Sequence, residues 1–279
     1  MKLINLKTNL YINFKSWKFP GGEVGIKIDD KIVYPEVKIV HRIQNSDDLM
    51  YLLMATNALR NKGVKKISLF LPYVPYARQD RVMIDGDSLS IKVFADIINS
   101  QNYEQVEILD PHSDVTPALI NNVQVEDNLK FASWSISDYI QNSNGNTSPV
   151  LVSPDAGAVK KIGKLRDYIN LPWTIVTGQK HRQLSTGKIT HTSIDKDVTG
   201  NTCFIVDDIC DGGRTFIELG KVLKEKGAKD VILIVTHGIF SQGFQVFSDH
   251  ISSIYTTNSF QDFSEEEKKN NSLKVYNML

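Results

Sequence analysis

The segment Thr202–Phe216, TCFIVDDICDGGRTF, constrains the fold of this chain more than any other part of its sequence. An apolar, β-branched run ends in two adjacent carboxylates, Asp207 and Asp208. Asp211 then opens a Gly-Gly turn, and a helical pattern follows as far as Lys226. A glycine turn at a helix N-terminus presents backbone N–H groups that bind phosphate. The neighbouring carboxylates suit hydroxyl donors or Mg2+, so we expect a βα unit with a sugar-phosphate site.

Short apolar runs alternate with helical patterns along the chain. Repeated βα units of this kind form mostly parallel sheets covered by helices, with ligand sites at the carboxyl ends of the strands. The predicted fold class is therefore α/β. Strands are predicted at 37–40, 67–71, 106–109, 150–152, 173–176, 204–206, 231–236, 251–255 and 274–276. Helices are predicted at 46–62, 89–100, 116–120, 156–168 and 216–226.

A polar stretch, QNSNGNTS at 141–148, interrupts the alternation and has the composition of a linker. We therefore predict an N-terminal domain over residues 1–142 and a C-terminal domain over residues 149–279, whose last residues could return to the first domain. The two halves have a similar order of predicted elements, which indicates a duplicated α/β domain.

Bulk charge gives no reason to expect a nucleic-acid or membrane partner, because 32 basic and 32 acidic side chains balance. A net charge near zero is compatible with self-association, so a homo-oligomer is expected. The two cysteines, Cys203 and Cys210, lack metal-ligand spacing, which favours a reducing compartment. The N-terminus has no signal-peptide pattern and no apolar run is long enough to span a bilayer, so a cytoplasmic location is expected.

Polar clusters follow the predicted strands, where this architecture has its ligand sites. The segment LPYVPYARQDR occupies residues 71–81, directly after one strand. Arg78 and Arg81 could clamp a polyphosphate, and Gln79 could form a hydrogen bond with a base or a ribose. A surface loop with ion pairs, such as Arg78 with Asp80, explains the same residues equally well.

Two further strand ends carry carboxylates. Asp110 and His112 follow the strand at 106–109 and have side chains that contact metal ions or phosphate, although a structural histidine is at least as common. Asp155 follows the strand at 150–152. It either belongs to a site or caps the helix predicted to begin near Ala156, and both roles could hold.

The segment TGQKHR at 177–182 is basic and continues into the polar, glycine-containing stretch LSTGKITHT. A mobile cationic loop of this kind is suited to closing over a polyphosphate transition state. A solvated basic loop is the simpler interpretation, and composition alone favours it slightly.

Together these segments resemble the ribose-phosphate pyrophosphokinases, also called phosphoribosyl pyrophosphate synthetases, from Phe19 to the C-terminus. PYVPYARQDR is similar to their ATP-binding signature PYxxYARQDR, and VDDICDGGRTF is similar to their ribose-5-phosphate loop VDDxxDTGGT. SPDAGAVKK resembles SPDxGGxxR, QKHR resembles the DKRR of the flexible catalytic loop, and FPGGE resembles FSDGE. The combination in this order is far more specific than any single motif. It implies two phosphoribosyltransferase-like domains, each a mostly parallel sheet flanked by helices.

The resemblance also implies a role for each matching residue. The residues implied to bind ATP are Phe19, Glu23, Arg78, Gln79, Arg81, Asp110 and His112, of which Phe19 and Glu23 would contact adenine across a subunit interface. The residues implied to bind ribose phosphate are Asp207, Asp208, Asp211, Gly212, Gly213, Arg214 and Thr215. The implied catalytic residues are Lys180, Arg182 and His112. The implied Mg2+ ligands are His112 and Asp155.

The implied reaction passes the β,γ-pyrophosphoryl group of MgATP to the anomeric 1-hydroxyl of ribose 5-phosphate and leaves AMP. The expected cofactor is Mg2+, with ATP as co-substrate. The expected assembly is a dimer or a dimer-based hexamer with the ATP site near a subunit interface.

The phosphate loop departs from the family pattern at two positions. Gly212 stands where the family has Thr, and Arg214 stands where it has Gly, so a hydroxyl donor is lost and a cation is gained. Arg214 could bind the same terminal phosphate in compensation. Alternatively, the acceptor is extended at its 5-phosphate, and ADP-ribose is a concrete candidate.

Two other classes of function are compatible with parts of the sequence. A phosphoribosyltransferase shares the fold and the ribose-phosphate loop but does not need the ARQDR cluster or the basic flap. A non-catalytic regulatory paralogue would have lost catalytic residues, whereas Lys180, Arg182, His112 and Asp207 are all present.

Overall fold

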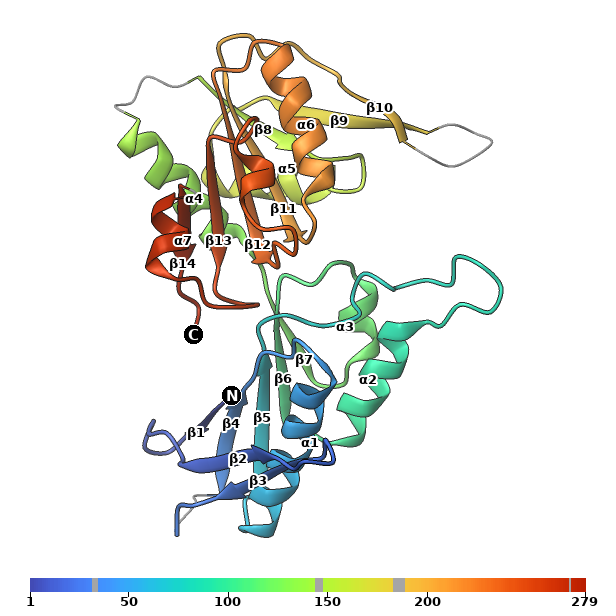
Figure 1. Cartoon of the computed structure of the whole chain (residues 1–279), viewed down its shortest axis with the longest axis vertical. Coiled ribbons are helices and arrows are strands. Elements are labelled where there is room, and N and C mark those ends of the chain that lie inside the picture. The colour runs from blue at the N-terminus through green and yellow to red at the C-terminus, as the bar shows by residue number, and fades with distance from the viewer. Residues whose placement is uncertain (32–34, 144–147, 183–188, 271) are drawn as a thin grey trace. The chain divides into compact units, whose positions relative to one another are not determined.

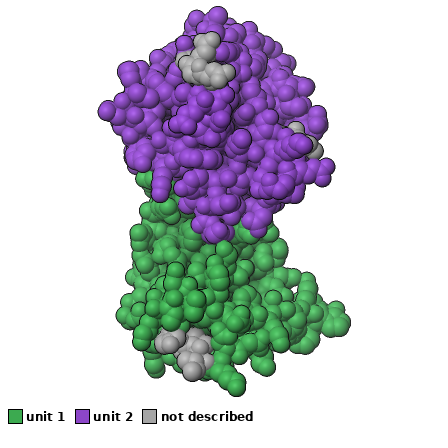
Figure 2. All heavy atoms as spheres, turned by 90° about the vertical axis from the view of Figure 1, so that its left-hand side faces the viewer, with its two compact units in different colours: residues 1–127 green, residues 128–279 purple. Residues whose placement is uncertain are grey.

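The computed structural model describes residues 1–31, 35–143, 148–182, 189–270 and 272–279 of the chain. The side chains of residues 180–182, 189–191 and 270 also lie outside the described part. Packing divides the chain into two compact units, residues 1–127 and residues 128–279, which are coloured separately in Figure 2.

The first unit is built on a five-stranded sheet in the order β1-β4-β5-β6-β7, which is parallel except for β1 (Figure 1). Its strands are β1 (Lys2–Asn5), β4 (Glu36–Val40), β5 (Lys66–Leu71), β6 (Gln105–Leu109) and β7 (Val123–Glu126). Its helices are α1 (Ser46–Asn61), α2 (Ser90–Ser100) and α3 (Val115–Leu119). A separate antiparallel hairpin of β2 (Phe14–Lys18) and β3 (Val24–Ile28) packs against α1.

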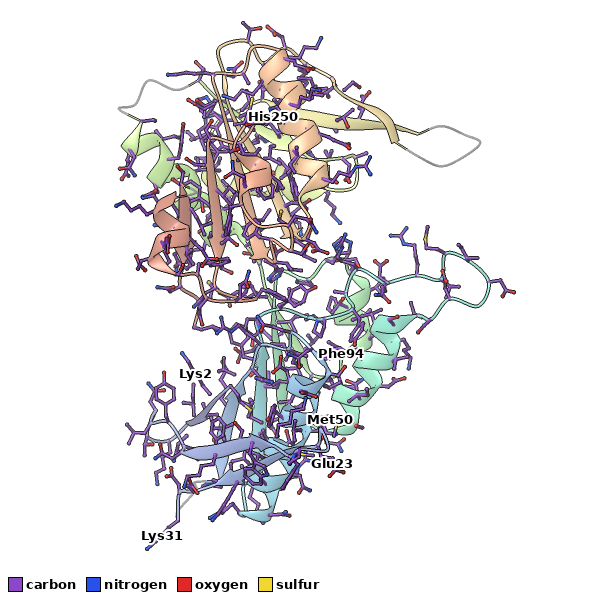
Figure 3. The ribbon with its side chains drawn as sticks, viewed as in Figure 1. Lys2, Glu23, Lys31, Met50, Phe94 and His250 are labelled. Carbon is purple, nitrogen blue, oxygen red and sulfur yellow. The ribbon has the colours of Figure 1, made fainter. Side chains whose placement is uncertain are left out.

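Spacing of apolar residues and local caps explain the helices of this unit. The buried side chains of α2 are Ile91, Phe94, Ala95 and Ile98, at the i, i+3, i+4 and i+7 spacing of one helix face. Phe94, labelled in Figure 3, belongs to the apolar core between this helix and the sheet. At the start of α1, the side chain of Asn45 accepts a hydrogen bond from the N–H of Asp48 at 3.1 Å, as an N-cap does.

The second unit is built on a seven-stranded sheet in the order β10-β9-β8-β11-β12-β13-β14 (Figure 1), in which β10 pairs antiparallel with β9 and the other pairs are parallel. Its strands are β8 (Pro149–Ser153), β9 (Ile175–Arg182), β10 (Ile189–Ile194), β11 (Thr202–Cys210), β12 (Asp230–Gly238), β13 (Ser253–Thr257) and β14 (Leu273–Tyr276). Its helical segments are α4 (Leu129–Asn142), α5 (Val159–Ile169), α6 (Arg214–Glu225), the 3-10 turn η1 (Gln245–Phe247) and α7 (Glu265–Asn270).

Strand β11 is central to the second unit because both of its faces are buried. Cys203 and Ile205 belong to one apolar cluster, and Phe204 and Val206 belong to the cluster on the other face. A parallel strand covered on both sides has a continuous apolar sequence, which explains why this run was recognisable in the sequence.

The structure differs from the sequence predictions in where several elements begin and end. The packing boundary lies between Asp127 and Asn128, N-terminal to the predicted linker, because α4 packs on α5 and β12 of the second unit. The last strand, β14, pairs with β13 of the second unit. Helix α5 begins at Val159, not near Ala156, and α6 already begins at Arg214.

Two strands are also longer than predicted. β9 continues past Val176 to Arg182 and forms an antiparallel hairpin with β10, so part of the predicted flap is strand. β11 continues to Cys210, so the adjacent carboxylates lie within the strand and not behind it. In the described part of the chain, no helix is both long and apolar enough to cross a membrane.

Candidate functional site

The turn between β11 and α6 forms an open cradle of backbone N–H groups. Gly213 precedes the helix in the left-handed conformation, with φ +77°, which turns the chain into the first helical turn. Within the described residues, the N–H groups of residues 212–215 donate to no other protein group. Unpaired N–H groups at a helix N-terminus, where the helix dipole is positive, form a binding site for phosphate.

Packing fixes the shape of this cradle. A Cβ atom on Gly213 would lie 2.3 Å from the ring of Phe247, so the aromatic side chain leaves room only for glycine. The hydroxyl of Ser241 donates to Asp211 Oδ1 at 2.6 Å, and the N–H of Ser241 donates to the Asp211 carbonyl at 3.2 Å. The segment after β12 therefore supports the loop, and Asp211 holds the cradle in place through these bonds.

Asp207 and Asp208 form a carboxylate pair just before the cradle. The side chain of Asp208 is buried, and its N–H donates to Asp207 Oδ1 at 2.9 Å. Burial raises the pKa of Asp207 well above its usual value, and the neighbouring charge of Asp208 adds to this shift, while the cation of Lys161 opposes it. Such a pair can share a proton and offers both a donor and acceptors to the hydroxyl groups of a sugar.

The two unusual residues of the loop have different surroundings. A Cβ on Gly212 would meet Gln242 at 3.6 Å and Ser241 at 3.9 Å, which are ordinary contacts, so packing does not require glycine there. Arg214 is 80% exposed, and its Nε lies 2.8 Å from Glu218 Oε1 on the outer surface of α6. The guanidinium is therefore held beside the cradle, along the helix.

In the first unit, polar segments leave the carboxyl ends of β5 and β6 in unusual backbone conformations. Tyr76, in the segment after β5, has φ +64°, and Asp110, directly after β6, has φ +41°. A left-handed conformation is rare for residues other than glycine and is often found at functional sites. The side chains between Tyr76 and the start of α2 include three exposed polar ones, those of Arg78, Gln79 and Arg81.

Asp80 lies within this exposed segment but is itself buried, with 6% of its side chain accessible. Its Oδ1 accepts a hydrogen bond from Arg81 Nε at 3.2 Å. A side-chain hydrogen bond with Ser113 also lowers the pKa of this carboxyl. Burial by itself raises the pKa of Asp80, but the hydrogen bonds from Ser113 and Arg81 outweigh it and hold the pKa below its usual value. The surface-loop interpretation gave an Arg78–Asp80 ion pair as its example, whereas the partners of Asp80 in the structure are Arg81 and Ser113.

The two predicted Mg2+ ligands differ in their surroundings. Asp155 is half-buried, and its Oδ1 accepts the N–H groups of Gly157 at 3.0 Å and Ala158 at 3.2 Å. These bonds close the turn before α5. The predicted capping of the helix is not observed, since the N-cap residue of α5 is Ala158 and no side chain caps it. His112 is exposed in the segment after β6. Among the described residues, no group of three or more His, Cys, Asp or Glu side chains is arranged around a common metal position.

The predicted adenine contacts, Phe19 and Glu23, face each other at the turn of the β2–β3 hairpin. The N–H of Phe19 donates to the Glu23 carbonyl at 2.7 Å, and the ring of Phe19 is exposed, edge-on to Trp17. Lys18 pairs with Asp47 of α1 at 2.6 Å, which fixes the hairpin beside the first turn of this helix. Glu23 is labelled in Figure 3.

The side chains of the predicted catalytic residues Lys180 and Arg182 lie outside the described residues.

Sequence reasoning did not identify the residues that support the site. Ser241 and Phe247 are distant from the phosphate loop in sequence, and no pattern in the chain indicates that they contact it. Glu218 could have been found, since it stands four residues after Arg214 on a predicted helix, where opposite charges pair. The sequence shows only that Asp80 is a charged residue in a polar segment. Its burial could not be predicted, because it depends on contacts with the segment after β6.

Known families match both parts of the chain. A family model described as the N-terminal domain of ribose phosphate pyrophosphokinase matches residues 4–101, and one described as a phosphoribosyl transferase domain matches residues 118–267. The chain is 32% identical to the ribose-phosphate pyrophosphokinase of Bradyrhizobium diazoefficiens, over 81% of this chain and 70% of that protein. The chain belongs to the ribose-phosphate pyrophosphokinase family. This membership confirms the predicted resemblance and makes the protein a transferase of the kinase type.

Further ribose-phosphate pyrophosphokinases agree with this assignment. Ribose-phosphate pyrophosphokinase 4 of Saccharomyces cerevisiae is 31% identical, over 85% of this chain and 71% of the yeast protein. The crystal structure of phosphoribosylpyrophosphate synthetase from Mycobacterium smegmatis superposes with a TM-score of 0.84 at 25% identity, covering 97% of this chain and 88% of that one. The predicted fold class, two phosphoribosyltransferase-like domains with mostly parallel sheets, is confirmed.

Proposed function

We propose that the protein transfers the β,γ-pyrophosphoryl group of ATP to the anomeric 1-hydroxyl of ribose 5-phosphate, giving phosphoribosyl pyrophosphate and AMP. The observation that carries this proposal is the open N–H cradle of residues 212–215, directly after the carboxylate pair of β11. The cradle supplies donors for a 5-phosphate, and Asp207 and Asp208 supply partners for the ribose hydroxyls. Together they match the two ends of a ribose phosphate.

The donor would be bound by residues of the first unit. Arg78 and Arg81 are exposed cations that can contact polyphosphate oxygens, and Gln79 can hydrogen bond with the nucleoside. The proposed adenine contacts are Phe19 and Glu23, contributed by a neighbouring copy of the chain. An exposed aromatic ring at a hairpin turn is suited to stacking on a base supplied from outside its own unit.

The Mg2+ requirement is also a proposal. Mg2+ prefers oxygen ligands and commonly takes one or two carboxylates together with substrate phosphates. Asp155 fits this chemistry because backbone N–H groups already orient its carboxylate. An imidazole suits Mg2+ less well, so exposed His112 is better suited to hydrogen bonding with phosphate oxygens. Bound Mg2+ would neutralise the charge that develops on the transferring group and on AMP.

The reaction needs positioning and charge stabilisation more than a strong base. Binding at Asp207, Asp208 and the cradle would hold the anomeric hydroxyl in place for attack on the β-phosphorus. Lys180 and Arg182 are proposed to close over the transferring group, as their resemblance to the flexible catalytic loop implies. Loss of one such cationic contact would cost on the order of 3 kcal/mol, or about a hundredfold in rate.

A second candidate acceptor is a ribose extended at its 5-phosphate, such as ADP-ribose. The observation that favours it is the combination of the side-chain-free position at Gly212 with the exposed cation of Arg214 beside the cradle. A second phosphate that extends outward from the cradle could pair with Arg214. Ribose 5-phosphate remains the first candidate because the cradle already supplies donors for its 5-phosphate and the carboxylate pair supplies partners for its ring hydroxyls.

The experiment that tests both candidates measures AMP formation from MgATP with ribose 5-phosphate or with ADP-ribose. Chromatography of the products identifies the pyrophosphorylated sugar. AMP release with ribose 5-phosphate alone would contradict the extended acceptor, and AMP release with ADP-ribose alone would contradict the first candidate. A folded protein that forms no AMP with either acceptor would contradict the proposed reaction, and Lys180→Ala serves as the matched inactive variant.

A further inference from the structure

The segment after β5 contains one buried carboxylate between exposed polar side chains. Arg78, Gln79 and Arg81 are exposed, whereas the side chain of Asp80 is 6% accessible. Burial of a charged carboxylate is unfavourable unless hydrogen bonds and cations compensate for the lost hydration. The position of Asp80 therefore requires an explanation that the solvent-exposed residues beside it do not.

The partners of Asp80 come from two different strand ends. Arg81 Nε donates to its Oδ1 at 3.2 Å within the segment after β5. From the segment after β6, a side-chain hydrogen bond with Ser113 and the charge of His112 both lower the pKa of the Asp80 carboxyl. Asp80 thus links the two segments that carry the predicted ATP-binding side chains.

The backbone around these segments is held at fixed points. The N–H of Gln79 donates to the carbonyl of Tyr76 at 2.9 Å, and the Gln79 carbonyl accepts the N–H of Ile91 in the first turn of α2 at 3.4 Å. Each segment contains a left-handed residue, Tyr76 before Arg78 and Asp110 directly after β6. Conformations of this kind are strained and persist only where the surrounding contacts maintain them.

We propose that Asp80 is a positioning residue for the nucleotide site, which ties the segment 78–81 to the segment 110–113. Arg81 is held by Asp80 in one orientation, so the cation is in place before the polyphosphate arrives. Preorganisation of this kind improves binding because less side-chain freedom is lost when the ligand binds. The inference rests on the proposed function, since it takes ATP as the ligand of these two segments.

A purely repulsive role for Asp80 does not fit its geometry. A carboxylate exposed next to Arg78 and Arg81 would disfavour a polyanion at the same site. Buried between Arg81 and Ser113, the charge is directed at protein donors, and its effect on a bound phosphate is screened by the guanidinium. The contact therefore orients the cation without leaving an exposed negative charge.

The test compares Asp80→Ala and Asp80→Asn with the matched control Asp85→Ala. Asp85 lies in the same connection but is exposed, with no hydrogen bond recorded among the described residues. Titration calorimetry with MgATP and steady-state kinetics with both substrates give the affinities, and thermal unfolding monitors the fold. We expect Asp80→Ala to weaken ATP binding about tenfold, the size of one charge-assisted hydrogen bond. The KM of this variant for the acceptor should stay within about twofold of the unmodified value. Asp80→Asn should weaken ATP binding by less than Asp80→Ala does.

Different outcomes separate this inference from the proposed reaction. A folded Asp80→Ala variant that binds ATP as tightly as the unmodified chain would overturn the role of Asp80. A parallel rise in KM for both substrates would also overturn it, because a general loss of structure has that effect. If Asp80→Ala does not fold, Asp80→Asn and Ser113→Ala must each weaken ATP binding at an unchanged unfolding midpoint. Absence of AMP formation in an unmodified chain that binds ATP would contradict the reaction, not the positioning role.

Discussion

The guanidinium of Arg214 and the carboxylate of Glu218 pair at 2.8 Å along the outer surface of α6. A cation in the first turn of a helix is disfavoured by the helix dipole, so the pair compensates for an unfavourable position. Exposed pairs of this type contribute little to stability, about 0–1 kcal/mol. The pair therefore adds little to the stability of α6, which leaves Arg214 available for the proposed contact with a ligand phosphate.

We predict that Arg214→Ala changes acceptor binding with little effect on stability. The unfolding free energy should change by about 0.5 kcal/mol or less, because the pair is exposed. The KM for the preferred acceptor should rise about tenfold if the cation contacts a phosphate group. Acceptor kinetics and urea unfolding measure the two effects. Lys221→Ala, which removes the cation of a similar pair with Glu225 on the same helix, is the control and should leave the KM unchanged.

A second prediction separates the two glycines of the phosphate loop. Gly212→Ala should change the unfolding free energy by less than about 1 kcal/mol, because its Cβ would meet only ordinary contacts, the closest at 3.6 Å. Gly213→Ala should destabilise by about 2 kcal/mol or more, since it combines φ +77° with a Cβ 2.3 Å from Phe247. Equal effects of the two substitutions in urea unfolding would contradict the assigned conformations.

Restoring the hydroxyl of the family pattern with Gly212→Thr should favour ribose 5-phosphate. A Cβ at this position makes only ordinary contacts, the closest with Gln242 at 3.6 Å, and the added hydroxyl could donate to the bound phosphate. We expect kcat/KM for ribose 5-phosphate to rise relative to that for ADP-ribose by about tenfold. Competition between the two acceptors measures the ratio, and Gly212→Ala controls for the loss of glycine itself.

The pKa of Asp207 predicts a pH-dependent stability. Because burial raises this pKa in the folded state, the folded chain binds the proton more tightly than the unfolded chain. The contribution of Asp207 to the free energy of unfolding should therefore fall as pH rises from the usual carboxyl pKa, about 4, through the raised value. Asp207→Asn should remove this loss, so that the variant is more stable than the unmodified chain at neutral pH and similar to it at pH 4.

Urea unfolding at pH 4 and pH 7.5 measures this effect, and Asp249→Asn, an exposed carboxylate of the same unit, is the matched control. The Asn variant should also lose most of its turnover, because the pair no longer offers a carboxylate to the ribose. An Asn variant that is no more stable than the unmodified chain at pH 7.5 would contradict the assigned burial cost.

The two interpretations of Asp155 predict different results for two substitutions. Asp155→Asn keeps an oxygen for the N–H groups of Gly157 and Ala158 and should cost little stability. Asp155→Ala removes both bonds and should cost about 1 kcal/mol. If the carboxylate binds Mg2+, both variants should need more Mg2+ for half-maximal AMP formation. An unchanged Mg2+ requirement in a folded Asn variant would leave Asp155 only the role of closing the turn before α5.

The sequence predicted the elements whose apolar pattern follows from burial in a parallel sheet. The strand at 204–206 and the helix at 89–100 are both present, because their apolar residues contact the core directly. The hairpin strand β2 was missed because nearly all of its side chains are exposed. It is held by pairing with β3, which in turn packs on α1, and no local pattern indicates either contact.

The predicted boundary illustrates a different limit. The polar stretch at 141–148 has the composition of a linker, but α4 buries Phe131, Ala132 and Ile136 in a cluster of the second unit. Polar composition shows where the chain is solvated, whereas the units are divided by which core a helix packs on. The site shows the same limit, since the strand-end carboxylates were recognisable and their supporting contacts were not.

The contact between Gly213 and Phe247 restricts how this loop can be varied. The ring fills the space above the glycine, so exchanging residue 213 would also demand a smaller residue at 247 and a tolerated positive φ. Such paired changes are rarely reached one mutation at a time. A library designed to alter acceptor choice should therefore randomise positions 212 and 214 around a constant glycine, and its members should keep their fold while their substrate range diverges.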